Sequence, residues 1–182
     1  MNNNDLVNKM TEYMSKYSDA SFSHWINYEL FTWQWWLCVF LCTVPLFIWW
    51  KVVEKKRLFE IMIFGLLVNI TCSYLDVIGT SFALWQYKIK IVPCVPLFFP
   101  IDYTVIPVTY MILYQMFSKW KSFIIAVIIT SLVFSFIGEP LDVWAGMYVM
   151  KRWNYIYSLP IYILIAIVCK ATVIWFIKKN RG

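Results

Sequence analysis

Five long apolar stretches alternate with short polar segments along this chain, and they constrain its fold more than any other feature. A helix needs about 20 apolar residues to cross the hydrocarbon core of a bilayer. Hydrophobic residues make up 62% of the 182 residues and charged residues only 14%, against about 45–50% and 25% in soluble domains. We therefore predict an all-α polytopic membrane protein with five transmembrane helices, which span about 31–50, 58–84, 92–117, 122–148 and 157–177.

Residues 1–30 contain no such stretch, so we treat them as a separate segment from the transmembrane domain at 31–182. They have neither the basic start nor the apolar centre of a cleavable signal peptide. Several apolar side chains recur at helical spacing and would share one face: Leu6, Met10, Tyr13, Met14 and Tyr17. We predict an amphipathic helix that lies in the membrane interface, with a partner-binding helix as the alternative.

The basic residues predict the orientation of the spans. Cytoplasmic ends of membrane helices carry an excess of Lys and Arg. One set of span ends carries nine: Lys51, Lys55, Lys56, Arg57, Lys119, Lys121, Lys178, Lys179 and Arg181. The opposite set carries six: Lys9, Lys16, Lys88, Lys90, Lys151 and Arg152. This difference predicts a cell-membrane protein with its N-terminus outside and its C-terminus in the cytoplasm.

Charged residues inside or at the ends of the spans mark a polar site. A charged side chain at the centre of a bilayer costs at least about 2.5–3.5 kcal/mol. This chain has five such residues: Asp76, Asp102, Glu139, Asp142 and Lys170. Glu139 and Asp142 are three positions apart and share a helical face. Asp76 lies at a similar predicted depth, so we expect the three acids to meet in one pocket near the outer leaflet.

Two stretches of the sequence also resemble each other, each with an acid, a glycine and a Trp-x-Tyr element. They are Asp76, Gly79, Trp85 and Tyr87, and then Asp142, Gly146, Trp153 and Tyr155. Asp102 and Lys170 each follow the tryptophan of their stretch by the same interval. This similarity favours a parallel two-helix repeat, with chance as the alternative. In such a repeat Asp102 and Lys170 would be neighbours and could form an ion pair; otherwise Lys170 would extend toward the cytoplasmic interface.

Carboxylates in a membrane have three chemical uses. They can catalyse acid–base chemistry on an apolar substrate, bind a hard cation, or accept hydrogen bonds from backbone that prolines have released from the helical pattern. We take as candidate ligand-binding residues Asp76, Asp102, Glu139, Asp142, Lys170, Trp85, Tyr87, Trp153 and Tyr155.

Other chemistries lack the necessary residues. His24 is the single histidine, which excludes a histidine-rich zinc or iron site, and no metal site is predicted. The five cysteines have no CxxC spacing and read as reduced, buried residues. The basic residues lie in short clusters between spans, so nucleic acid is not an expected partner. The sequence names no cofactor.

Two groups of residues, within roughly residues 60–178, carry a family resemblance. They are Pro100-Ile101-Asp102-Tyr103, Pro107 and Tyr114-Gln115, and then Glu139 to Trp144, Lys151, Trp153 and Tyr157-Ser158. On these residues the chain resembles a family of small multi-pass membrane proteins from endospore-forming bacteria, whose function is not established. The resemblance implies a multi-pass topology.

A fainter similarity rests on the order of Asp76, Trp85, Tyr87 and Pro100-Ile101-Asp102-Tyr103. In this order the chain resembles the membrane-embedded lycopene cyclase domain. In that family paired glutamates are thought to protonate a polyene. Here Asp102 and Tyr103 replace the pair, and Lys170 stands in the second copy, so the cyclase activity itself is not expected.

The sequence therefore predicts an integral membrane protein that binds a small or lipid-like ligand in an acidic pocket, alone or as a subunit of a membrane complex. One alternative is a membrane-embedded enzyme that uses carboxylate acid–base catalysis on an isoprenoid or lipid. Another is a proton- or cation-coupled transport component. Five helices leave little room for a pore, so transport would require a homo-oligomer or a partner subunit. The remaining expected partner is membrane lipid.

Overall fold

The structure, a computed structural model, describes residues 2–180 and is mostly helical. Within that range, four helical segments are long and apolar enough to cross a membrane: Trp33–Val52, Lys55–Ser81, Trp120–Trp144 and Tyr155–Lys179. The all-α class of the prediction is thereby confirmed. Arg181, one of the basic residues counted above, lies outside the described residues.

The elements follow one another in a simple order. They are α1 (Asn3–His24), η1 (Trp25–Glu29), α2 (Trp33–Val52), η2 (Lys55–Arg57), α3 (Leu58–Ser81), β1 (Trp85–Tyr87), η3 (Pro100–Val105), α4 (Ile106–Met116), α5 (Trp120–Val133), η4 (Phe134–Gly138), α6 (Glu139–Trp144), β2 (Tyr148–Met150) and α7 (Tyr155–Asn180). The elements η3 with α4, and α5 with η4 and α6, are continuous helical runs. Each contains a π-helical stretch, η3 or η4.

The third predicted span differs from the observed element. The helix begins at Pro100 instead of residue 92. It consists of η3, with 6 residues, and α4, with 11 residues. Pro93, Pro96 and Pro100 explain the delay, because proline has no N–H to donate and disfavours helix at the residue before it. At about 1.5 Å per residue this segment is roughly 26 Å long, somewhat less than the hydrocarbon core of about 30 Å.

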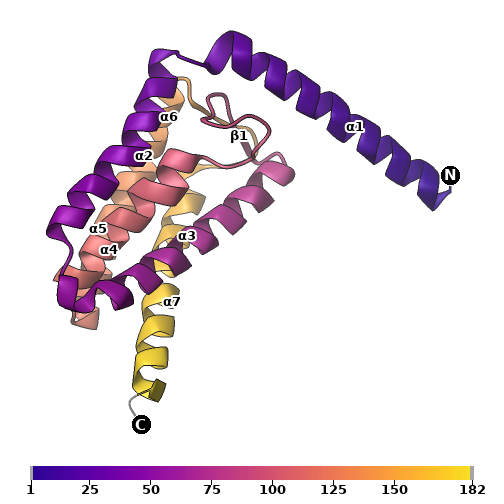
Figure 1. Ribbon diagram of the computed structural model, residues 1–182. Coiled ribbons are helices and arrows are strands. Elements are labelled where there is room, and N and C mark those ends of the chain that lie inside the picture. The colour runs from indigo at the N-terminus through magenta and orange to yellow at the C-terminus, as the bar shows by residue number, and fades with distance from the viewer. Residues whose placement is uncertain (1, 181–182) are drawn as a thin grey trace.

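The helices form one bundle, and α1 projects sideways from one end of it (Figure 1). Helix α3 packs against α4 and α7, α5 packs against α7, and α2 packs against η3. The centre of the bundle is aromatic and aliphatic: Phe64 stacks on Tyr114 and meets the edge of Phe123. We call the end that carries β1 and β2 the strand end. The opposite end, where α2 meets α3 and α4 meets α5, is the basic end.

The two short strands show how two parts of the chain correspond, α3 with β1 and the run from α5 to α6 with β2. β1 and β2 pair antiparallel, with Gln86 opposite Val149 at the centre. Helix α3 ends at Ser81 before β1 begins at Trp85, and α6 ends at Trp144 before β2 begins at Tyr148. Each feature of the second half therefore follows its counterpart by 63 positions (81 to 144, 85 to 148, 86 to 149).

This offset supports a parallel repeat but corrects the pairing inferred from the sequence. Asp76 corresponds to Glu139 instead of Asp142, and Trp85 corresponds to Tyr148 instead of Trp153. The Trp-x-Tyr similarity matched the wrong positions, because Trp85 begins β1 whereas Trp153 lies after β2, in the connection to α7. Asp102 and Lys170 are then no longer equivalent positions.

Gly79 is the position where the strand end tolerates no side chain. A Cβ there would collide with the indole ring of Trp85, whereas a Cβ at Gly138 would meet only the Val133 carbonyl oxygen, at 3.8 Å. We expect Gly79→Ala to lower the free energy of unfolding by about 1–3 kcal/mol, measured by thermal unfolding in detergent. Gly138→Ala is the matched control and should unfold at or slightly above the wild-type temperature. Equal effects of the two substitutions would contradict the close packing of Trp85 on α3.

Candidate functional site

A cavity of about 240 Å³ lies at the strand end, between α3, η3, α6 and α7. Strands β1 and β2 contribute Trp85, Tyr87 and Tyr148 to its lining. All four acids of the predicted site also line it: Asp76, Asp102, Glu139 and Asp142. The structure thus brings these acids together from three different elements, as the sequence predicted for three of them.

The carboxylate of Asp76 receives three hydrogen bonds. Its Oδ1 accepts from the Trp85 indole N–H at 2.7 Å and from the Tyr87 hydroxyl at 2.6 Å. Its Oδ2 accepts from the backbone N–H of Phe98 at 3.0 Å. The chain makes this possible by folding back after α3, where the Leu84 N–H bonds to the Gly79 carbonyl at 2.9 Å. Asp76 therefore fastens both β1 and the 88–99 connection to the end of α3.

Asp102 shares a donor with Asp76. The Phe98 N–H that contacts Asp76 is also 3.2 Å from Oδ2 of Asp102, one turn into the following helix. Both acids are buried, with 4% and 7% of their surface exposed. Two carboxyl groups that meet at one N–H can hold a proton between them.

Glu139 and Asp142 lie on α6 across the cavity and have fewer donors. Oε1 of Glu139 accepts from the Tyr162 hydroxyl at 3.0 Å. Its Oε2 is buried and makes no hydrogen bond of normal geometry with a described residue, although the Ser158 hydroxyl lies near the carboxylate. The half-buried carboxylate of Asp142 likewise accepts no hydrogen bond from the part of the chain that the structure describes. The two sides of the cavity therefore differ sharply in how well their acids are satisfied.

The tyrosines of the strands are neutral donors. Burial raises the pKa of the Tyr87 hydroxyl well above its ordinary value, and the nearby carboxylates of Asp76 and Asp102 raise it further. Burial also raises the pKa of Tyr148, with a smaller effect from Glu139. Both hydroxyls keep their protons at neutral pH and can donate to an acid or to a ligand.

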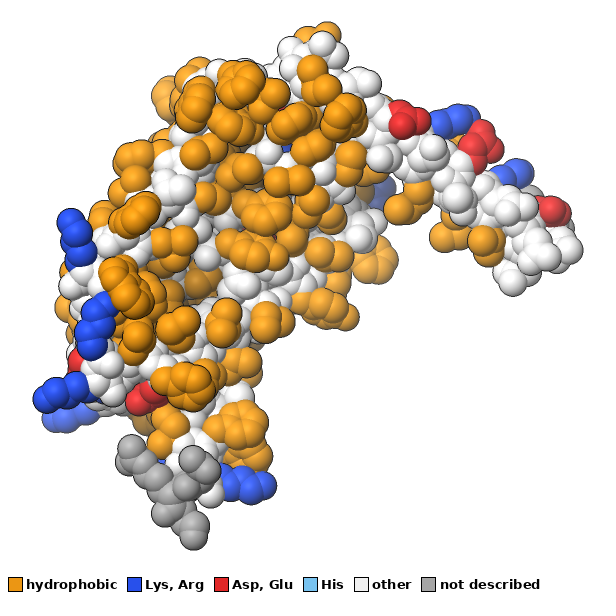
Figure 2. Space-filling model, in the orientation of Figure 1, with side chains coloured by type: hydrophobic (Ala, Val, Ile, Leu, Met, Phe, Trp, Pro, Cys, Tyr) orange, Lys and Arg blue, Asp and Glu red, His pale blue; other side chains and the backbone are white. Residues whose placement is uncertain are grey.

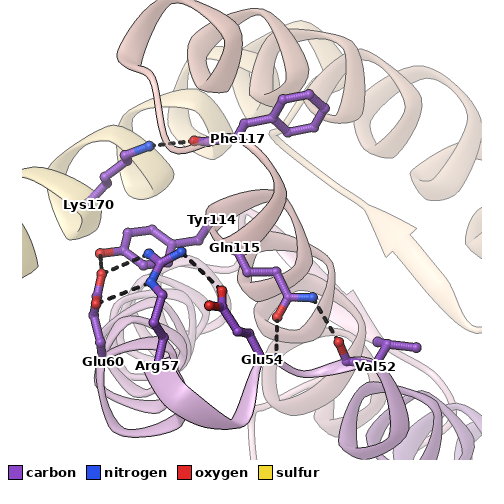
Figure 3. A network of polar contacts seen from close by, with 8 residues as sticks. All are labelled: Val52, Glu54, Arg57, Glu60, Tyr114, Gln115, Phe117 and Lys170. Carbon is purple, nitrogen blue, oxygen red and sulfur yellow. Dashed lines mark hydrogen bonds and ion pairs between the residues drawn. The ribbon is translucent and has the colours of Figure 1, made fainter.

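Lys170 does not belong to this site, and its predicted ion pair with Asp102 does not form. Its Nζ donates to the carbonyls of Phe117 at 2.8 Å and Ser118 at 3.3 Å, which end the α4 segment at the basic end (Figure 3). The ammonium also lies 3.9 Å from the centre of the Phe123 ring. As in the alternative, its side chain is directed toward the basic end, but it is buried there, with 2% of its surface exposed, instead of reaching the interface.

A second polar network surrounds Lys170 and was not predicted. Arg57 pairs with Glu60 at 3.0 Å, and the Tyr114 hydroxyl donates to the same carboxylate (Figure 3). The side chain of Gln115 donates to the Val52 carbonyl and accepts from the Glu54 N–H, each at 3.1 Å. These contacts join α2, α3 and α4 at the basic end and leave the strand end as the place for a ligand.

Of the remaining candidates, Trp153 lines the cavity and Tyr155 does not. The Trp153 indole donates to Ser158 at 2.9 Å, and its ring meets the edge of Trp85 with centroids 4.9 Å apart. Sequence reasoning missed Tyr148, Ser158 and Tyr162. The spacing of Ser158, Tyr162 and Ile165 along α7 places them on one helical face, and this was the signal that could have found two of them.

Glu29 was also missed, although it is almost fully buried. It accepts from the backbone N–H of Lys90 at 2.6 Å and contacts Nδ1 of His24 at 2.9 Å. The Trp25 indole donates to the Lys90 carbonyl at 2.9 Å. These bonds fasten the segment that precedes α2 to the connection after β1, close to the cavity but outside its lining.

No family model matches this chain, and neither a curated protein nor a solved structure matches it significantly. The two family resemblances noted in the sequence therefore stay predictions. The described residues contain no group of three or more His, Cys, Asp or Glu that could hold a metal ion.

We expect an Asp-to-Asn substitution to destabilise the protein on the α3 side of the cavity and to leave its stability almost unchanged on the α6 side. Asp76→Asn replaces Oδ2 by an NH₂ group that faces the Phe98 N–H, so we expect the free energy of unfolding to fall by about 2–3 kcal/mol. Asp142→Asn removes no hydrogen bond from the described residues and should change it by less than about 0.5 kcal/mol. Thermal unfolding of the two purified variants measures the difference. Similar destabilisation by both would show that the acids are satisfied alike.

Proposed function

We propose that this chain is an integral membrane protein that crosses the bilayer five times, with the strand end in the outer leaflet and the basic end at the cytoplasm. The short η3 and α4 segment would provide the fifth crossing, since it runs from the strand end to the basic end (Figure 1). The side of the bundle in Figure 2 is predominantly hydrophobic, and most of its Lys and Arg side chains lie at the lower end. This distribution agrees with the orientation that the basic residues predict.

In this arrangement α1 would rest on the outer membrane surface. The helix extends sideways from the bundle, with hydrophobic side chains along its lower side and charged ones along its upper side (Figure 2). Its apolar residues are exposed, among them Met10, Tyr13 and Met14. An amphipathic helix of this kind binds lipid headgroups with its apolar face buried at the acyl boundary. Membrane lipid is therefore the expected partner of α1.

The proposed function is to bind a small or lipid-like ligand in the acidic cavity near the outer leaflet. The observation that carries this proposal is the unpartnered Oε2 of Glu139, a buried acceptor on a residue that lines the cavity. A buried acceptor without a donor costs about 1–3 kcal/mol. A ligand that donates a hydrogen bond would recover that free energy on binding.

The size and lining of the cavity indicate what fits. Drug-sized ligands occupy pockets of about 300–1,000 Å³, so a cavity of about 240 Å³ suits a small molecule or one part of a lipid. Five isoleucines line it beside the acids: Ile78, Ile101, Ile106, Ile161 and Ile165. Ile78 of α3 is also exposed, so the cavity reaches the surface of the bundle. An occupant with a polar and an apolar part matches this lining.

A membrane-embedded acid–base enzyme is the second candidate, and the contact between Asp76 and Asp102 favours it. A carboxyl group that holds a proton beside an apolar cavity can transfer it to an isoprenoid or lipid. Under this reading, Asp102→Asn would abolish turnover of a bound substrate while the protein still folds. A bound molecule that returns chemically unchanged after incubation with the wild-type protein would favour the binding function.

Native mass spectrometry of gently purified protein tests the binding function. We expect a retained small molecule or lipid on the wild type. Ile161→Trp, which fills the cavity, should remove it. Leu164→Trp is the matched control, since it adds the same side chain to an exposed position of α7, and the ligand should remain. Loss from both variants, or retention by both, would place the bound molecule outside the cavity. A retained partner subunit in the same spectra would identify the protein as part of a complex.

A further inference from the structure

The acids on α6 also indicate which chemical class the ligand belongs to, an inference that rests on the proposed binding function. The lining of the cavity contains four carboxyl groups and no Lys, Arg or His. Lys170 is remote from it, with its ammonium bound to the carbonyls of Phe117 and Ser118. No described residue therefore brings a cation to the cavity.

The shortage of donors is confined to one side. On the α3 side, Trp85, Tyr87 and the Phe98 N–H already serve Asp76. On the α6 side, Oε2 of Glu139 has no donor of normal geometry among the described residues although the side chain is 91% buried, and Asp142 lies one turn away on the same helix. An occupant at this side gains the most binding free energy if it carries a positive charge and also has N–H or O–H groups to donate.

Aromatic rings complete the lining around these acids. Tyr148 and Tyr162 line the cavity together with Trp153. Aromatic faces attract organic cations, by about 0.5–1 kcal/mol at exposed sites and more where water is excluded. Carboxylates combined with tyrosine and tryptophan rings form a lining that suits an organic ammonium group. The isoleucines of the lining suit an alkyl chain.

We propose that the cavity binds an amphiphilic primary or secondary amine, whose protonated nitrogen donates to Oε2 of Glu139 while its alkyl part lies against the isoleucines. An amine of this kind is protonated at pH 7, as the lysine side chain is. The nitrogen must carry hydrogens, because Oε2 of Glu139 lacks a donor and a quaternary ammonium has none to give.

Four probes of equal chain length separate the contributions. Hexylamine supplies charge and N–H groups, hexyltrimethylammonium supplies charge alone, hexanol supplies an O–H group alone, and hexanoate supplies the opposite charge. Their dissociation constants can be measured at pH 7 by ligand-observed NMR with the full-length protein in nanodiscs, after subtraction of binding to empty nanodiscs. We expect hexylamine to bind about ten- to a hundredfold more tightly than hexanol, and hexyltrimethylammonium to bind more weakly than hexylamine.

Variants assign this preference to α6. Glu139→Gln should reduce hexylamine affinity at least about tenfold and leave hexanol affinity unchanged. Glu12→Gln, the same change on the exposed face of α1, should leave both affinities unchanged. Asp142→Asn is a second variant, which loses no hydrogen bond in the structure and should also weaken hexylamine. It keeps the test decisive where Glu139→Gln does not fold.

The outcomes distinguish this inference from the function on which it rests. Hexanol or hexyltrimethylammonium binding as tightly as hexylamine would overturn the amine assignment. Unchanged hexylamine affinity in both Glu139→Gln and Asp142→Asn would also overturn it. In either case a molecule retained in native mass spectra and lost from Ile161→Trp would still support the binding function. No probe binding, together with empty native spectra, would overturn both.

Discussion

The strand end depends on the hydrogen bonds that the Asp76 carboxylate accepts. A polar backbone segment near the membrane must have its N–H groups satisfied within the protein. Asp76 satisfies the Phe98 N–H and fixes Trp85 and Tyr87 of β1 over the end of α3. The pairing of β1 with β2 then extends this anchor to the second half of the bundle. The cavity exists because these short strands cover the space between the halves instead of filling it.

The two ends of the bundle carry buried or half-buried charges of opposite sign, cations at the basic end and carboxylates at the strand end. At the basic end, Lys170 donates to the carbonyls that follow α4 and Arg57 pairs with Glu60, so these two cations are satisfied, and Lys170 joins α7 to the end of α4. At the strand end the donors are unevenly shared: Asp76 accepts three hydrogen bonds, whereas Oε2 of Glu139 on α6 accepts none of normal geometry. The bundle is thus closed at one end by satisfied polar contacts and left with an unsatisfied acceptor at the other. That asymmetry is the physical basis for a ligand.

The sequence predicts the helical membrane class because span length and apolar content are local properties. It also predicts the meeting of Asp76, Glu139 and Asp142, since acids at similar depth in one small bundle have few alternatives. It does not predict that helix starts only at Pro100, because the three prolines were read as part of a span. The sequence comparison was wrong to treat Trp85 and Trp153 as equivalent positions of the repeat. The register of β1 and β2 decides the correspondence, and it depends on contacts between residues more than 60 positions apart. The donor shortage at Glu139 also needs three-dimensional structure, since the Tyr162 hydroxyl that donates to it comes from another helix, α7.

An experimental structure of the protein in nanodiscs of its native lipid tests the central claim most directly. The claim is that the cavity is a ligand site because the protein leaves Oε2 of Glu139 without a donor. We predict density for a non-protein group within about 3 Å of that oxygen, extending toward Ile161. Side chains that fill the cavity, or a protein donor bound to Oε2 of Glu139, would contradict the account.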